Sequence, residues 1–235
     1  MTGDLLNALS STAFLRAALT TVWLTAAAQA VGTLGGALLA PLRMANNAAA
    51  RAFASCYLLI FRGTPELLQL IAWYAVLPLA GVNLNLVEIA VIGLGANESA
   101  RMVEIIRGAL LGVDGGQADA ARSVGLTRLR ALRHVILPQA MPAIIAGLGN
   151  EVNIMFKTTS LVSVIGMTEL LGQSEIVAQT ARNPLGPYLA ALVYYLLLTT
   201  IWAAGQGLLT NRGGDVRVGG RSVIGAWWNA LSGEL

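Results

Sequence analysis

The stretch Asp119-Ala120-Ala121-Arg122-Ser123-Val124-Gly125 is followed, after nine residues, by Val135-Ile136-Leu137-Pro138. This segment is rich in charge, yet it lies between long apolar stretches of the chain. Its pattern predicts two short helices, because Gly125 favours the end of the first and Thr127 can cap the second. Asp119 favours the N-terminal end of the first helix. We therefore expect residues 115–138 to protrude from the apolar part of the protein.

The first predicted helix carries a small apolar patch made by Ala120, Ala121 and Val124. We expect Leu137-Pro138 to redirect the chain into the next apolar segment. Two short helices at an angle would fit a cleft in a partner protein. The alternative is an ordinary amphipathic loop that lies on the lipid headgroups.

The composition predicts a polytopic, all-α membrane protein. Of the 235 residues, 56% are hydrophobic and only 11% are charged, whereas about a quarter are charged in an ordinary soluble domain. The apolar residues come in blocks, and a helix needs about 20 such residues to cross a bilayer. The net charge of +3 fits arginines on cytoplasmic loops better than a nucleic-acid-binding surface.

We expect five membrane-spanning segments in a transmembrane domain of residues 1–210, followed by a cytoplasmic tail of residues 211–235. The expected spans are residues 17–39, 67–79, 86–110, a fourth that begins near Pro142, and 188–209. Residues 52–60 are too short to cross alone, so they lie at the interface or begin the second span, and residues 61–65 interrupt it. Gly32 and Gly36 have the spacing that permits close helix contact. A short helix is expected within residues 168–181.

The arginines predict the orientation of the spans, because positive charge accumulates on cytoplasmic loops. In a five-span arrangement one side receives Arg43, Arg51, Arg122, Arg128, Arg130, Arg133, Arg212, Arg217 and Arg221. The other side has little basic charge besides Arg182. The N-terminus is therefore expected outside the cell and the C-terminus in the cytoplasm.

The third and fourth expected spans contain polar and charged residues, which are costly in a membrane and are functional candidates by default. Three- and four-residue spacing places Asn97, Arg101, Glu104 and Gly108 on one helical stripe, and Asn150, Asn153 and Lys157 on another. We expect these stripes to face the interior of the bundle or a water-filled path.

The sequence offers no sign of catalysis by the chain itself. It has no phosphate-binding loop of the GxxxxGK[ST] type. His134 is the one histidine and Cys56 the one cysteine, so no metal site is predicted. No pair of nucleophile and base is recognisable.

The charged insert resembles the EAA loop of permease subunits of bacterial ABC importers. The match has two conservative departures, Asp119 in place of Glu and Val135 in place of Ile. In such importers this loop couples the permease to an ATPase. The resemblance therefore implies a coupling role for Asp119, Ala120, Ala121, Gly125, Leu137 and Pro138.

Further segments resemble those of polar amino-acid permeases, in the same order along the chain. They are Phe61-Arg62-Gly63-Thr64-Pro65 with Gln69, Glu104-Ile105-Ile106-Arg107-Gly108, Gly149-Asn150-Glu151 and Lys157-Thr158-Thr159-Ser160-Leu161. The resemblance implies the transmembrane domain of a type I ABC importer (MetI-like), with about five transmembrane helices, in the bacterial inner membrane. It also implies alternating access driven by two ABC ATPase subunits, which bind ATP and Mg²⁺, while this chain binds no cofactor. A second permease subunit, a solute-binding protein, membrane lipid and an amino-acid substrate complete the expected partners, without nucleic acid.

The same resemblance gives the substrate-binding candidates Asn97, Arg101, Asn150, Glu151, Lys157 and Thr158. An amino acid is a zwitterion, so Arg101 and Lys157 could bind its carboxylate and Glu151 its ammonium group. Alternatively, Arg101 neutralises Glu98 or Glu104, and Asn150 and Glu151 make interhelical hydrogen bonds. Thr158 stands where many relatives carry Asp, and Arg101 where they often carry an aromatic residue. These departures favour neutral polar or acidic substrates over lysine or arginine.

Other functions remain open at this point. An ABC permease could carry another small solute, such as an opine or a compatible solute. An ion-coupled secondary carrier or a channel is less favoured, because the sequence shows no strong internal repeat and carries the cytosolic insert. A membrane scaffold without transport is disfavoured by the charges inside the spans.

Overall fold

The computed structural model describes residues 2–211, and the regular structure of that part of the chain is helical. The α-helices are α1 (Thr2–Ser10), α2 (Thr12–Met44), α3 (Ala48–Gly63), α4 (Glu66–Val76), α5 (Leu86–Leu111), α6 (Gly115–Ser123), α7 (Arg128–Ala131), α8 (Leu137–Thr158), α9 (Leu170–Ala178) and α10 (Leu185–Asn211). This confirms the all-α prediction. The predicted tail, with its three arginines, lies outside the described residues except for Asn211.

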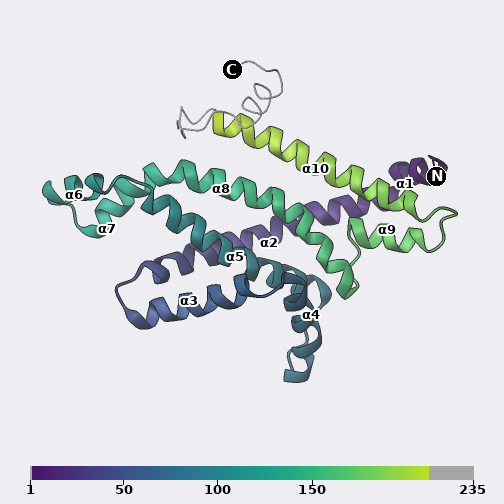
Figure 1. Ribbon diagram of the computed structural model, residues 1–235, viewed down its shortest axis with the longest axis horizontal. Helices are drawn as coiled ribbons and strands as arrows, with labels where there is room; N and C mark the ends of the chain where they lie inside the picture. The colour runs from purple at the N-terminus through teal and green to yellow at the C-terminus, as the bar shows by residue number, and fades with distance from the viewer. Residues whose placement is uncertain (1, 212–235) are drawn as a thin grey trace, which may run out of the picture.

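The longest helices run roughly along one axis of the molecule, and α4 projects to one side of it (Figure 1). Helices α6 and α7 lie at one end, while α1, α9 and the N-terminus lie at the other. The short helix predicted within residues 168–181 is present as α9. One apolar core joins α1, α2, α9 and α10 around Phe14 and Leu170, and a second joins α2, α4, α5 and α8 around Leu94 and Met155.

Helices α2 and α5 form a tightly packed pair, and glycines make this possible. A Cβ atom at Gly32 would overlap the side chain of Glu98, and one at Gly36 would overlap Met102. The spacing of these two glycines therefore serves a contact within the chain. The N-terminal end of each helix is fixed by a capping side chain. Ser11 caps α2, and Asn85 caps α5 in a capping box with Glu88.

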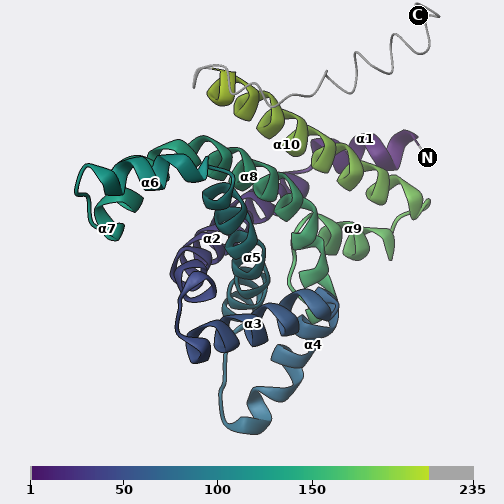
Figure 2. The same ribbon diagram turned by 60° about the vertical axis from the view of Figure 1, so that its left-hand side comes forward.

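The second expected span is broken into two separate helices. Helix α3 has 16 residues and α4 has 11, so each is shorter than a bilayer crossing. Pro65 separates them, because it lacks an N–H group and restricts Thr64, which is extended with φ −124° and ψ 151°. Helix α4 leaves the α2–α5 pair at a steep angle in both views (Figures 1 and 2).

Three helical segments of the described chain are long and apolar enough to cross a membrane: Thr12–Met44, Arg128–Ile165 and Leu185–Leu208. Helix α5 has 26 residues, and at 1.5 Å per residue it is about 39 Å long. Every 18-residue stretch of α5 contains at least three of its five charged residues, Glu88, Glu98, Arg101, Glu104 and Arg107, whereas each of the three segments has an apolar stretch of that length with two charges or fewer. The total of five spans therefore stays a prediction.

Candidate functional site

Four charged side chains meet between the helices. We call them the central cluster: Glu66, Glu98, Arg101 and Glu151. They come from α4, α5 and α8. Arg101 donates a hydrogen bond from Nε to Glu98 Oε2 at 3.1 Å, and its Nη1 donates to Glu66. Its Nε also lies 3.2 Å from Glu151 Oε2. One guanidinium thus contacts three carboxylates.

The burial of Glu98 shows how α2 supports the cluster. Its side chain is fully buried, and Gln29 of α2 donates a hydrogen bond from Nε2 to Glu98 Oε1 at 2.8 Å. Gly32 leaves the space that the Cβ and Cγ atoms of Glu98 occupy. A charge buried in this way is tolerated only when it is paired and hydrogen-bonded, and Glu98 has both kinds of partner.

Two buried atoms of the cluster still lack a hydrogen-bond partner among the described residues. They are Nη2 of Arg101, which is a donor, and Oε2 of Glu151, which is an acceptor. The contact between Arg101 Nε and Glu151 Oε2 is an ion pair without hydrogen-bond geometry. The cluster can therefore offer one donor to an anionic group and one acceptor to a cationic group, side by side.

The sequence identified part of this cluster. Arg101 and Glu151 were predicted to belong to the site, and Glu98 was one of the two carboxylates considered as partners of Arg101. Glu104, the other, pairs with Arg107 at 2.8 Å and with Arg43 at 4.0 Å. Glu66 was missed, because it lies 35 positions before Arg101 and helical periodicity does not connect different helices.

Asn97 lies next to the cluster in sequence but serves the junction between α3 and α4. Its amide donates to Gln69 Oε1 at 2.5 Å. Gln69 Nε2 in turn donates to Thr64 Oγ1 at 2.6 Å and to the carbonyl oxygens of residues 60, 61 and 64. These are carbonyls that the end of α3 leaves without helical partners. Asn97 thus makes a structural contact in this conformation, and its contact with substrate stays a prediction.

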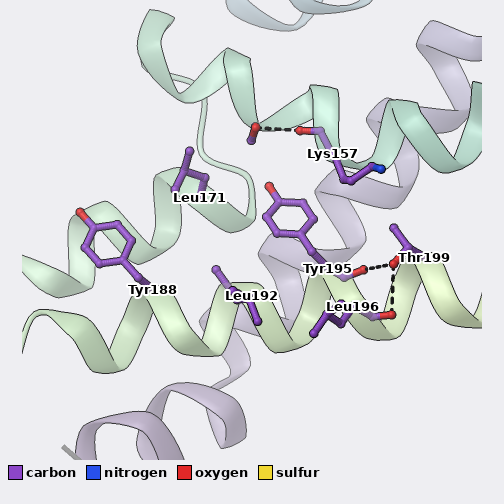
Figure 3. A pocket seen from close by; sticks show the side chains of 9 residues that line it. Lys157, Leu171, Tyr188, Leu192, Tyr195, Leu196 and Thr199 are labelled. Atoms are coloured by element: carbon purple, nitrogen blue, oxygen red, sulfur yellow. Dashed lines mark hydrogen bonds between the residues drawn. The ribbon is translucent and has the colours of Figure 1, made fainter. Parts of the chain in front are cut away.

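The remaining substrate-binding candidates lie apart from the central cluster. Lys157 lines a groove of about 420 Å³ between α8, α9 and α10, together with Tyr188, Tyr195 and Thr199. Figure 3 shows its side chain between α8 and α10, and no member of the central cluster lines this groove. Asn150 is exposed, and Thr158 donates to the carbonyl of Ile154. The predicted stripe on α8 thus does not converge with Arg101.

The charged insert forms two short helices, as predicted. Helix α6 ends in a Schellman motif, in which Gly125 has φ +84° and the N–H of Leu126 donates to the carbonyl of Ala121 at 3.1 Å. The Thr127 side chain caps α7. The N-cap of α6 is Asp114; Asp119 lies mid-helix, 3.8 Å from Arg122. The prediction that Asp119 marks the start of the helix is wrong, because Asp114 supplies the capping carboxylate.

The apolar patch of the insert is divided between two faces. Ala121 is 6% exposed and packs inside the insert. Val124 and Leu129 are 77% and 74% exposed, and Ala120 is exposed beside them. Ala120, Val124 and Leu129 are therefore the exposed members of the insert that a partner could contact.

The chain does not turn at Leu137-Pro138, contrary to the prediction. Helix α7 continues through a π-helical turn at Leu132–Ile136 directly into α8. The N–H of Leu137 donates to the carbonyl of Leu132. A proline has no N–H and its ring needs space in the preceding turn, so the wide π turn accommodates Pro138 without breaking the helix.

Known proteins share the sequence pattern and the fold of this chain. The family described as "Binding-protein-dependent transport system inner membrane component" matches residues 32–212. The arginine transport system permease protein ArgU of Corynebacterium glutamicum is 40% identical in an alignment of 204 residues that covers 81% of this chain and 65% of ArgU. This chain thus spans just under two thirds of the length of that relative.

Two further similarities cover most of both chains. The probable amino-acid permease protein YxeN of Bacillus subtilis is 34% identical over 80% of this chain and 85% of YxeN. A crystal structure of an amino acid ABC transporter with histidines contains a chain with a TM-score of 0.82 and 36% identity. That match covers 85% of this chain and 94% of the solved chain.

Proposed function

This chain belongs to the family of binding-protein-dependent transport system inner membrane components, and we propose that it carries a polar amino acid or a close analogue through the membrane. It is an integral protein of the inner membrane and has the fold of a type I ABC importer permease. The named relatives are permeases for arginine or for amino acids, which supports this substrate class. In this role the chain is the non-catalytic subunit of an ATP-driven importer.

The observation that carries the proposal is the unpartnered donor beside the unpartnered acceptor in the central cluster. A zwitterion brings a carboxylate for Nη2 of Arg101 and an ammonium group for Oε2 of Glu151. Both bonds would be charge-assisted, the stronger class of hydrogen bond. The ligand would thereby supply a hydrogen bond to each of two buried atoms that otherwise lack one.

The partners follow from the position of the insert. Helices α6 and α7 lie at the end of the molecule away from α1 and α9 (Figure 1), and the exposed Val124 and Leu129 of the insert could be received there by an ATPase subunit. We propose two such ATPases, which bind ATP and Mg²⁺, a second permease subunit, identical or paralogous, and a solute-binding protein on the opposite side. Closure of the ATPases would then switch the central cluster from one side of the membrane to the other.

The test is reconstitution in proteoliposomes with the cognate ATPase and binding protein. Uptake of at least one labelled polar amino acid is expected, and it should require ATP and the ATPase subunit. Uptake that proceeds without the ATPase when an ion gradient is supplied would identify a secondary carrier. Uptake of an opine in preference to every amino acid would favour the second ABC function.

The orientation can be tested by labelling single cysteines. Cys56 is the one native cysteine, so Cys56→Ser gives a background without thiols. We propose that the N-terminus is outside and the C-terminus is cytoplasmic. An impermeant maleimide should therefore label Asn183→Cys in intact cells, and Thr127→Cys only after the membrane is opened. The reverse labelling pattern would contradict the proposed orientation.

A further inference from the structure

The charges of the central cluster are not balanced. Three carboxylates, each from a side chain with 24% or less of its surface exposed, surround the single guanidinium of Arg101. The positive charge of the exposed Arg62 also attracts Glu151. Water and salt screen an exposed charge more strongly than a buried one, so Arg62 offsets the negative charge of the cluster less than Arg101 does. Glu66, Glu98 and Glu151 together form a receptor for a cation, and the chain itself supplies the occupant.

We propose that Arg101 is a specificity-determining residue, whose guanidinium fills a cation subsite made by Glu66, Glu98 and Glu151 and so excludes substrates with a positively charged side chain. This inference rests on the proposed function and narrows its substrate to amino acids without a net positive charge, so it predicts a substrate different from the arginine that gives the relative ArgU its name. The ammonium group of such a substrate still has Oε2 of Glu151. Its carboxylate still has Nη2 of Arg101.

The exclusion follows from competition between a tethered and a free ligand. Arg101 is attached to α5 next to its carboxylates, so its effective concentration there is at least in the millimolar range. A free guanidinium or ammonium side chain must displace Arg101 from Glu98 and Glu66 before it can bind. A cation that enters beside Arg101 instead would meet a like charge in a weakly screened site.

The position of Glu98 strengthens the assignment. Its carboxylate is fully buried and is held by Gln29 as well as by Arg101. If Arg101 loses its charge, Glu98 keeps one hydrogen bond but no cation. The emptied subsite should then attract an external cation of matching shape, because a buried unpaired carboxylate is unfavourable.

The experiment measures the melting temperature of the purified transporter complex with added methylguanidinium, and with N-methylurea as the uncharged analogue. Arg101→Met should be stabilised by methylguanidinium by about 3–6 °C near tenfold saturation, and not by N-methylurea. The wild type and Arg101→Lys should respond to neither compound. Glu98→Gln added to Arg101→Met should remove most of the response. If Arg101→Met does not assemble, Arg101→Gln takes its place, because it retains a hydrogen-bond donor without the charge.

A transport arm measures the exclusion itself. Arginine should compete with wild-type uptake of a labelled neutral amino acid at least about tenfold more weakly than an unlabelled neutral amino acid does, and this comparison does not depend on uptake by Arg101→Met, which has lost the donor for the substrate carboxylate. An Arg101→Met complex that methylguanidinium does not stabilise overturns the subsite and leaves the proposed transport intact. Wild-type complexes that import arginine as well as neutral amino acids overturn the exclusion. Wild-type complexes without any ATP-dependent uptake overturn the proposed function, whatever the melting temperatures are.

Discussion

The Glu151→Gln variant should bind its amino acid about 10- to 150-fold more weakly while the transporter complex assembles in normal yield. The change keeps the shape of the side chain but removes the charge that would accept the ammonium group. A hydrogen bond to a charged group contributes about 1.5–3 kcal/mol, which corresponds to this range of affinity. Folding should be largely unaffected, because Arg101 retains its hydrogen bonds to Glu66 and Glu98.

The measurement is the apparent KM of ATP-dependent uptake, with the yield of complex after size exclusion. Glu104→Gln is the matched control, since Glu104 is a carboxylate on α5 that pairs with Arg107 outside the cluster. Its uptake should remain close to that of the wild type. Unchanged KM in Glu151→Gln, or an equal loss in Glu104→Gln, would remove Glu151 from the substrate site.

The second large effect is expected at the insert. Val124→Glu combined with Leu129→Glu should reduce the affinity for the ATPase subunit at least about 100-fold and abolish coupled transport. Both side chains are more than 70% exposed here, so the substitutions should not disturb the insert itself. Burying an unpaired carboxylate in an interface is strongly unfavourable, at about 3 kcal/mol or more. Co-purification with the ATPase and stimulated ATP hydrolysis measure the two consequences.

Two comparison variants separate docking from folding. Val82→Glu makes the same change in the loop before α5, at a residue that is 44% exposed, and should leave the ATPase bound. Ala121→Glu places a charge inside the insert, where Ala121 is almost fully buried, and should unfold it. A double variant that still binds the ATPase with wild-type affinity would show that this face does not dock.

The sequence predicted helices best where its local signals were strong. Gly125 and Thr127 were correctly assigned to the end of one short helix and the cap of the next, because both act locally, Gly125 through its left-handed backbone and Thr127 through its side chain. The break between α3 and α4 was seen as an interruption, but the angle of α4 depends on contacts such as that of Asn97 with Gln69. The π turn before Pro138 was not predicted, because the sequence indicates only that a proline must be accommodated.

The candidate site was predicted in part for the same reason. Periodicity along α5 grouped Arg101 with both Glu98 and Glu104, and it could not decide between them. Glu66 contacts Arg101 and Gln29 contacts Glu98 from other helices, so only the three-dimensional arrangement could place them. Lys157 was grouped with the α8 stripe, whereas the packing of α10 gives it a groove of its own.

The unbroken helix that begins in the insert gives the protein a lever. From Arg128 the helical path continues through the π turn and α8 to Glu151, a length of about 35 Å at 1.5 Å per residue. A tilt of about 5° at the insert end would swing the other end through about 3 Å, as much as a whole hydrogen-bond length. A small movement of an ATPase would thus suffice to separate Glu151 from Arg101. Bending at the π turn would absorb that movement before it reached Glu151.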